Sequence, residues 1–101
     1  MIEIKPLDSL TTMRECALKL LEEASEACEA LKEHDKVQDW NTYQDALCEL
    51  ADVAQCMCNC LQVLDPANVD WERAVRVVQK HNLERGRNDM PGTRTLKIDW
   101  H

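Results

Sequence analysis

The sequence predicts an all-α fold, in which two long antiparallel helices and a shorter third form a helical bundle. Apolar residues recur with spacings of three and four over two long segments, which is typical of amphipathic helices. The connections between these segments are short, so neighbouring helices should run antiparallel. The 101 residues suit a single domain, residues 1–101, with a helical part over about 12–86 and an extended tail over 87–101.

The first helix is expected to begin behind Thr12, because residues 12–15 (TMRE) have the pattern of a capping box. Residues 2–7 alternate apolar and polar side chains, which permits a short strand or an extended arm. The helix should fade near residues 34–35. Its apolar stripe occupies a and d positions and consists of Met13, Ala17, Leu20, Ala24, Ala27 and Leu31.

The second helix follows a polar connection over residues 35–39 and should end at residues 65–66, because the residue before a proline disfavours helix. Asn68 or Asp70 can cap the third helix, and Gly86 is a natural stop for it. The apolar faces are those of Tyr43, Ala46, Leu47, Leu50, Ala54, Met57, Leu61 and Leu64 on the second helix, and of Trp71, Ala74, Val75 and Val78 on the third.

The segment Thr95–Trp100 is a weak strand candidate that could pair with residues 2–5, in the same chain or in a partner. The apolar faces of the long helices exceed what one short chain can cover. We therefore expect self-association into a homodimer or homotetramer, which would complete a four-helix core.

The net charge is −7, from 12 Lys and Arg against 19 Asp and Glu. This balance argues against binding to a nucleic acid polymer, which requires a basic surface. We find no signal-like segment and no apolar run that approaches the length of a membrane span, so we expect a cytoplasmic protein with reduced thiols and no membrane partner. Among the six cysteines, Cys56 and Cys60 share a helix face and Cys58 points elsewhere, which favours buried thiols over a zinc site.

Two pairs of acidic residues suggest chemistry. On the first helix Glu22, Glu23 and Glu26 lie within about a 100° arc, and Glu23 and Glu26 are neighbours at i and i+3. Considered alone, these acids suit an ordinary solvated face.

The second pair, Glu49 and Asp52, changes this interpretation. Glu49 falls inside the apolar stripe of the second helix, where a carboxylate needs a cation. No Lys or Arg occurs between Lys36 and Arg73, so a structural partner would have to come from another helix. Such a partner could be Lys19 or Arg73.

Two such pairs on antiparallel helices can converge, and mutual repulsion opposes this unless a cation lies between them. Oxygen ligands favour Mg²⁺, with Mn²⁺ as a substitute, and a carboxylate site for Mg²⁺ keeps water-filled positions. Such positions are what a phosphate-transfer site requires.

These residues resemble a known family. The run Glu22-Glu23-Ala24-Ser25-Glu26, followed by Glu49-Leu50-Ala51-Asp52, is similar to the EExxE…ExxD signature of MazG-like nucleoside triphosphate pyrophosphohydrolases, which belong to the all-α NTP pyrophosphatase superfamily. Residues 80–87 look like the basic stretch that follows the third helix in such proteins. The resemblance covers about residues 12–87.

The resemblance implies hydrolysis of the α–β phosphoanhydride of a (deoxy)nucleoside triphosphate to the monophosphate and pyrophosphate. It assigns Mg²⁺ binding to Glu23, Glu26, Glu49 and Asp52, and places Glu22 at the attacking water or at a further metal ion. The resemblance also implies that Lys80, Asn82, Arg85 and Arg87 contact the substrate. Alternatively, these residues only stabilise the C-terminal end of the third helix through their favourable interaction with the helix dipole. The main alternative function is a non-enzymatic α-helical interaction module with a solvated acidic face.

Overall fold

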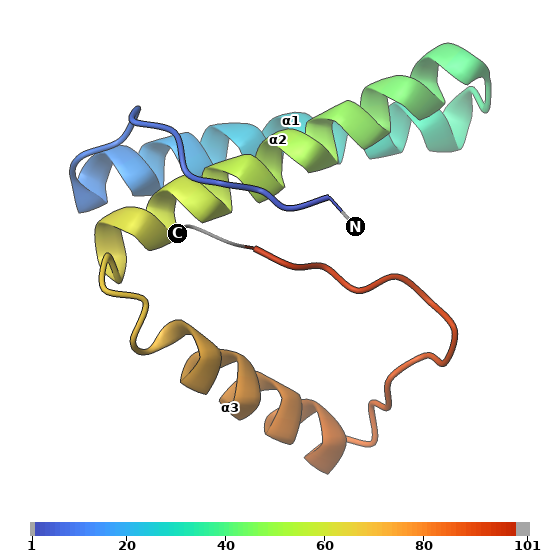
Figure 1. Cartoon of the computed structure of the whole chain (residues 1–101). Helices are drawn as coiled ribbons and strands as arrows, with labels where there is room; N and C mark the ends of the chain where they lie inside the picture. The colour runs from blue at the N-terminus through green and yellow to red at the C-terminus, as the bar shows by residue number, and fades with distance from the viewer. Residues whose placement is uncertain (1, 99–101) are drawn as a thin grey trace.

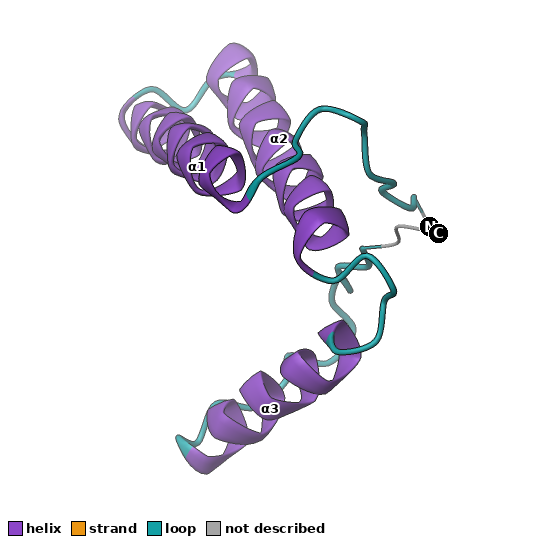
Figure 2. Cartoon of the chain, turned by 90° about the vertical axis from the view of Figure 1, so that its left-hand side faces the viewer, coloured by secondary structure: helices purple, strands orange, loops and turns teal. Residues whose placement is uncertain are grey.

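Two long helices pack side by side as a hairpin, and a third helix diverges from them (Figures 1 and 2). The structure is a computed structural model that describes residues 2–98. Helix α1 spans Met13–Lys36, α2 spans Trp40–Leu64 and α3 spans Trp71–Glu84. Residues 2–98 contain no strand, so the predicted all-α bundle of two long helices and a shorter third is confirmed.

Local capping sets the ends of the hairpin. The side chain of Thr12 accepts a hydrogen bond from the backbone N–H of Glu15 at 3.1 Å, so α1 begins where the sequence predicts. At the start of α2, Asp39 and Thr42 form a capping box that the sequence analysis did not identify, with the Thr42 N–H donating to Asp39 Oδ1 at 2.9 Å. These two caps fix the reversal between α1 and α2.

The cap of α3 differs from the prediction. Asp70 stands at the N-cap position, but its side chain makes no capping hydrogen bond and pairs with Arg73 at 2.9 Å instead. Asp65 takes over this role, because its carboxylate accepts three backbone N–H groups, those of Val69, Asp70 and Trp71, at 3.0–3.1 Å. At the other end of α3, Gly86 adopts a φ of +75°, the left-handed conformation that suits a helix stop.

The two ends of the described chain meet beside α2 (Figure 1). Ile4 and Ile98 form one isolated parallel β-bridge. The pairing expected between residues 2–5 and 95–100 is therefore reduced to a single bridge among residues 2–98, and residues 99–100 lie outside the described part. The N-terminal segment, residues 2–12, thus behaves as an extended arm.

The interface between α1 and α2 is built mainly from small side chains: Cys16, Ala27, Ala46 and Cys56. Within residues 2–98, Glu23 is the only charged residue that is buried. Several leucines of these helices stay exposed, as the sequence predicts for a chain with more apolar surface than it can cover. They are Leu18, Leu20, Leu21, Leu31, Leu47 and Leu50.

By length and composition alone, α2 is apolar enough to cross a membrane, although the sequence analysis expected no such segment. This is weak evidence for a span, because the core helix of a soluble protein passes the same test. Among the described residues no other helix meets the criterion. Helix α2 packs along α1 and carries Glu49 and Asp52, two acidic residues, in its middle.

Candidate metal centre

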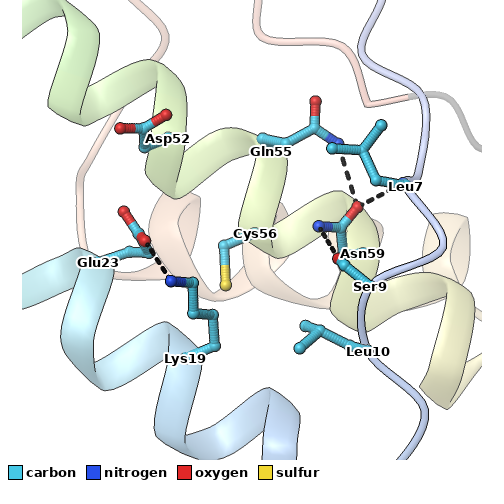
Figure 3. Close-up of a pocket in the computed structure, with 9 residues that line it drawn as sticks. All are labelled: Leu7, Ser9, Leu10, Lys19, Glu23, Asp52, Gln55, Cys56 and Asn59. Atoms are coloured by element: carbon cyan, nitrogen blue, oxygen red, sulfur yellow. Dashed lines mark hydrogen bonds and ion pairs between the residues drawn. The ribbon is translucent and has the colours of Figure 1, made fainter.

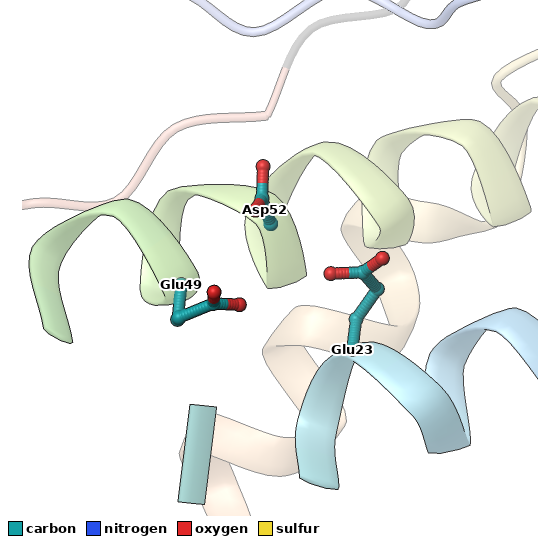
Figure 4. A group of neighbouring side chains, drawn as sticks. All are labelled: Glu23, Glu49 and Asp52. Atoms are coloured by element: carbon teal, nitrogen blue, oxygen red, sulfur yellow. The ribbon is translucent and has the colours of Figure 1, made fainter. Parts of the chain in front are cut away.

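Three carboxylates from two helices converge between α1 and α2 (Figure 4). Glu23 comes from α1, and Glu49 and Asp52 come from successive turns of α2. One oxygen of each lies within 4.8 Å of the others. The structure thus brings together three of the four residues predicted as metal ligands. The fourth, Glu26, is exposed, but its side chain reaches Glu49 closely enough to perturb it.

Two oxygens of this cluster are buried without a hydrogen-bond partner among the described residues: Glu23 Oε2 and Glu49 Oε2. Glu23 is only 8 % exposed. Burial raises the pKa of Glu49, and the charges of Glu26, Asp52 and Glu23 raise it further. A buried carboxylate oxygen that lacks a donor is costly unless a cation neutralises it.

Lys19 is the one cation at the cluster among the described residues. Its Nζ lies 3.1 Å from Glu23 Oε1 and 3.4 Å from Glu22 Oε1, and these carboxylates raise its pKa. The sequence analysis considered Lys19 or Arg73 as a structural partner for Glu49. Neither basic residue pairs with Glu49 in the structure. Lys19 pairs with Glu22 and Glu23 on its own helix, and Arg73 pairs with Asp70. Glu49 Oε2 stays unpartnered.

The donor set fits a hard divalent cation. Carboxylate oxygens are the ligands that Mg²⁺ and Mn²⁺ prefer. Mg²⁺ holds its ligands at about 2.1 Å in an octahedron, so adjacent oxygens stand about 3.0 Å apart and opposite oxygens about 4.2 Å apart. The oxygens of the cluster lie within 4.8 Å of one another, so the side chains would have to move closer together around an ion. Glu23, Glu49 and Asp52 could therefore hold such an ion, with Glu26 as a further ligand.

A cavity of about 350 Å³ opens beside the cluster (Figure 3). Glu23 and Asp52 form part of its wall, together with Lys19. Its opposite wall is formed by Leu7 and Leu10 of the N-terminal segment. A molecule in this cavity would contact charged groups at one end and apolar groups at the other.

The sequence analysis missed the residues that build the arm side of the cavity. Gln55 Nε2 donates to the backbone oxygen of Lys5 at 2.7 Å, and the Leu7 N–H donates to Asn59 Oδ1 at 2.7 Å. Asn59 Nδ2 also donates to Ser9 Oγ at 3.3 Å. Gln55 and Asn59, one turn apart on α2, thus attach the arm to the helix. The signal in the sequence was a polar i, i+4 pair within an apolar helix.

The four predicted substrate contacts lie elsewhere in the chain. Lys80 and Asn82 belong to the C-terminal half of α3, and Arg85 and Arg87 follow it. Figures 1 and 2 show this end of α3 directed away from the hairpin, and α3 does not pack extensively on α1 or α2. Asn82 and Arg87 line a separate polar cavity of about 390 Å³. One chain therefore does not bring these residues to the acidic cluster.

The cysteines do not form a second metal site among the described residues. Cys56 Sγ and Cys60 Sγ are 4.0 Å apart, whereas Cys58 Sγ donates to the backbone oxygen of Ile4. Burial raises the pKa of Cys56, and burial with the neighbouring thiols raises the pKa of Cys60 to about 12. Burial therefore favours the neutral form of both thiols in the metal-free protein.

The raised pKa of Glu49 predicts how pH affects the metal-free protein. Above its ordinary value of 4.5, the folded chain retains a proton on Glu49 that the unfolded chain has released. The contribution of Glu49 to stability is therefore present below pH 4.5 and is lost as the pH rises through the raised value. We expect the melting temperature in EDTA to fall over this range more in the wild type than in Glu49→Gln. Parallel curves for the two proteins would contradict the assignment.

No family model, curated protein or solved structure matches this chain. The functional assignment therefore depends on the residues of the site and on the likeness of its two acidic motifs to the MazG-like signature.

Proposed function

We propose that this protein hydrolyses the α–β phosphoanhydride of a (deoxy)nucleoside triphosphate, giving the monophosphate and pyrophosphate, as MazG-like enzymes do. The observation that carries the proposal is the pair of buried oxygens on Glu23 and Glu49 that have no hydrogen-bond partner among the described residues, in a cluster that Asp52 completes. A solvated acidic face, as in a non-enzymatic interaction module, does not account for a carboxylate that is 8 % exposed.

The metal ligands in this proposal are Glu23, Glu26, Glu49 and Asp52, which would bind Mg²⁺ or Mn²⁺. A bound divalent cation neutralises phosphate charge and lowers the pKa of water. Glu22 is the proposed base that receives the proton of the attacking water. Its side chain is 57 % exposed next to Glu23, so water reaches its carboxylate. The Glu22 carboxylate lies 3.4 Å from the ammonium of Lys19, a residue that lines the cavity.

The experiment is a panel of canonical and modified (d)NTPs incubated with the purified protein, with Mg²⁺ or with EDTA, and assayed for pyrophosphate. We expect Mg²⁺-dependent pyrophosphate release from at least one nucleotide. Release of inorganic phosphate alone would place cleavage at the γ-phosphate and contradict the proposal. Absence of any product across the panel would support the interaction module.

We also propose that the chain works as a homodimer or homotetramer in the cytoplasm. At 100° per residue, Leu20 and Leu31 lie within about 20° of each other on α1 and form an exposed stripe. Leu50 of α2 is exposed as well. In an oligomer, α3 of one copy could carry Arg85 and Arg87 to the site of another.

Replacing two exposed leucines by glutamine, Leu20→Gln with Leu50→Gln, is expected to shift the oligomer towards monomer. The two residues are 38 % and 46 % exposed, so part of each is covered within its own chain and the fold must be checked alongside the oligomer. Sedimentation equilibrium measures the shift, and circular dichroism checks helix content. Leu96→Gln in the tail, at 63 % exposure, is the control and should leave the oligomer intact. An unchanged oligomer in the double variant would rule out this interface.

A further inference from the structure

The cavity beside the acidic cluster contains one basic side chain. Lys19 is the only Lys or Arg among the residues that line it, and its side chain is 45 % exposed. Figure 3 shows its ammonium directed at Glu23, on the opposite side of the cavity from Leu7 and Leu10. The ammonium therefore lies in the cavity wall beside Glu23.

A divalent cation at the cluster would change the surroundings of this ammonium. In the structure, Glu23 Oε1 forms an ion pair with Lys19 Nζ at 3.1 Å, and Glu23 Oε2 has no hydrogen-bond partner among the described residues. A metal ion bound by Glu23 would repel a positive charge a few ångströms away and weaken that ion pair. The four-carbon stem of lysine is flexible, so the ammonium can then turn into the cavity.

Charge balance explains why a bound triphosphate needs this lysine. Five carboxylates lie at or next to the cluster: Glu22, Glu23, Glu26, Glu49 and Asp52. One Mg²⁺ leaves this region negative, which opposes the approach of a polyphosphate anion. Basic residues of α3 are engaged locally, since Arg73 pairs with Asp70, Arg76 with Glu72 and Lys80 with Glu84.

We propose that Lys19 is a substrate-binding residue that donates hydrogen bonds to the phosphate oxygens of the nucleotide in this cavity. The inference rests on the proposed function and adds to it the residue that attracts the anion within a single chain. In the metal-free protein the same ammonium forms ion pairs with Glu23 and Glu22. In this proposal Lys19 would pair with Glu22 and Glu23 before the metal binds, and with phosphate oxygens of the nucleotide afterwards.

The test compares Lys19→Met with the wild type in the pyrophosphate assay at saturating Mg²⁺. Loss of a charged hydrogen bond to phosphate is expected to raise KM for the nucleotide roughly 10- to 100-fold, with a much smaller change in kcat. Lys19→Arg should restore most of the lost affinity, because the positive charge is kept. Lys32→Met is the matched control, since Lys32 also pairs with a glutamate of α1, Glu29, and lies on the exposed surface.

Metal binding without nucleotide separates this role from a structural one. In Lys19→Met, Mn²⁺ affinity measured by electron paramagnetic resonance should stay the same or increase, because a competing cation is removed. An unchanged KM in Lys19→Met, with an active wild type, would overturn this inference alone. An inactive wild type would overturn the proposed function and the inference with it. If Lys19→Met loses its helix content, Lys19→Gln, which keeps a polar side chain, takes its place in the same assay.

Discussion

The Glu49→Gln protein is expected to lose pyrophosphate release and to melt at a higher temperature than the wild type when both are free of metal. Removal of groups that only support a metal ligand costs about 10- to 100-fold, so loss of a ligand itself should cost more than about 100-fold in kcat/KM. The stability gain has a different cause. The substitution removes a half-buried charge that faces Glu26, Asp52 and Glu23 and that has no donor for Oε2.

The control for this substitution is Glu29→Gln, which changes the same chemical group on an exposed site of α1, where the side chain is 79 % exposed. It should alter neither activity nor melting temperature appreciably, since exposed ion pairs contribute little. The activity loss and the stability gain of Glu49→Gln must occur together. If Glu49→Gln were active, or were destabilised, the carboxylate would serve the packing of the helices rather than a cation.

Mg²⁺ is expected to stabilise the wild-type protein strongly. A ligand present at 100 times its dissociation constant stabilises the folded state by about 2.7 kcal/mol. For a domain of about 100 residues, this corresponds to a rise of roughly 10 to 20 °C in melting temperature. The physical reason is that the ion supplies the charge that the buried oxygens of Glu23 and Glu49 lack. Differential scanning calorimetry at constant ionic strength measures the shift.

The same titration of Glu49→Gln tests whether the stabilisation comes from the cluster. We expect most of the shift to disappear, because the variant has lost one ligand and one charge. A shift of equal size in both proteins would mean that Mg²⁺ stabilises the fold through general screening of its net charge of −7.

The hairpin could be predicted from the sequence because its signals are local. Helical periodicity defines α1 and α2, and Thr12 marks the beginning of α1. The position of Glu49 within the apolar face of α2 also follows from periodicity alone, and this placed it opposite α1. Glu23 of α1 lies close to Glu49 in the structure. Local sequence patterns do not predict this contact, because the two residues are far apart along the chain.

Features that depend on the course of turns, or on contacts between distant segments, could not be predicted. Asp65 caps α3 from six residues before Trp71, although Asp70 stands at the usual position. Asn59 was not singled out in the sequence, and the course of the N-terminal segment supplies two of its partners, Leu7 and Ser9. The path of α3 away from the hairpin is likewise set by the turn before it, so Lys80 and Arg87 could not be placed from the sequence.

The central claim is that the carboxylates of Glu23, Glu49 and Asp52 form a binding site for a divalent cation. Titration of the wild type with Mn²⁺, followed by electron paramagnetic resonance, tests it most directly. The account predicts saturable binding that Mg²⁺ displaces, that Glu49→Gln abolishes and that Glu29→Gln leaves intact. Mn²⁺ binding that is weak, does not saturate and is equal in the three proteins would contradict it.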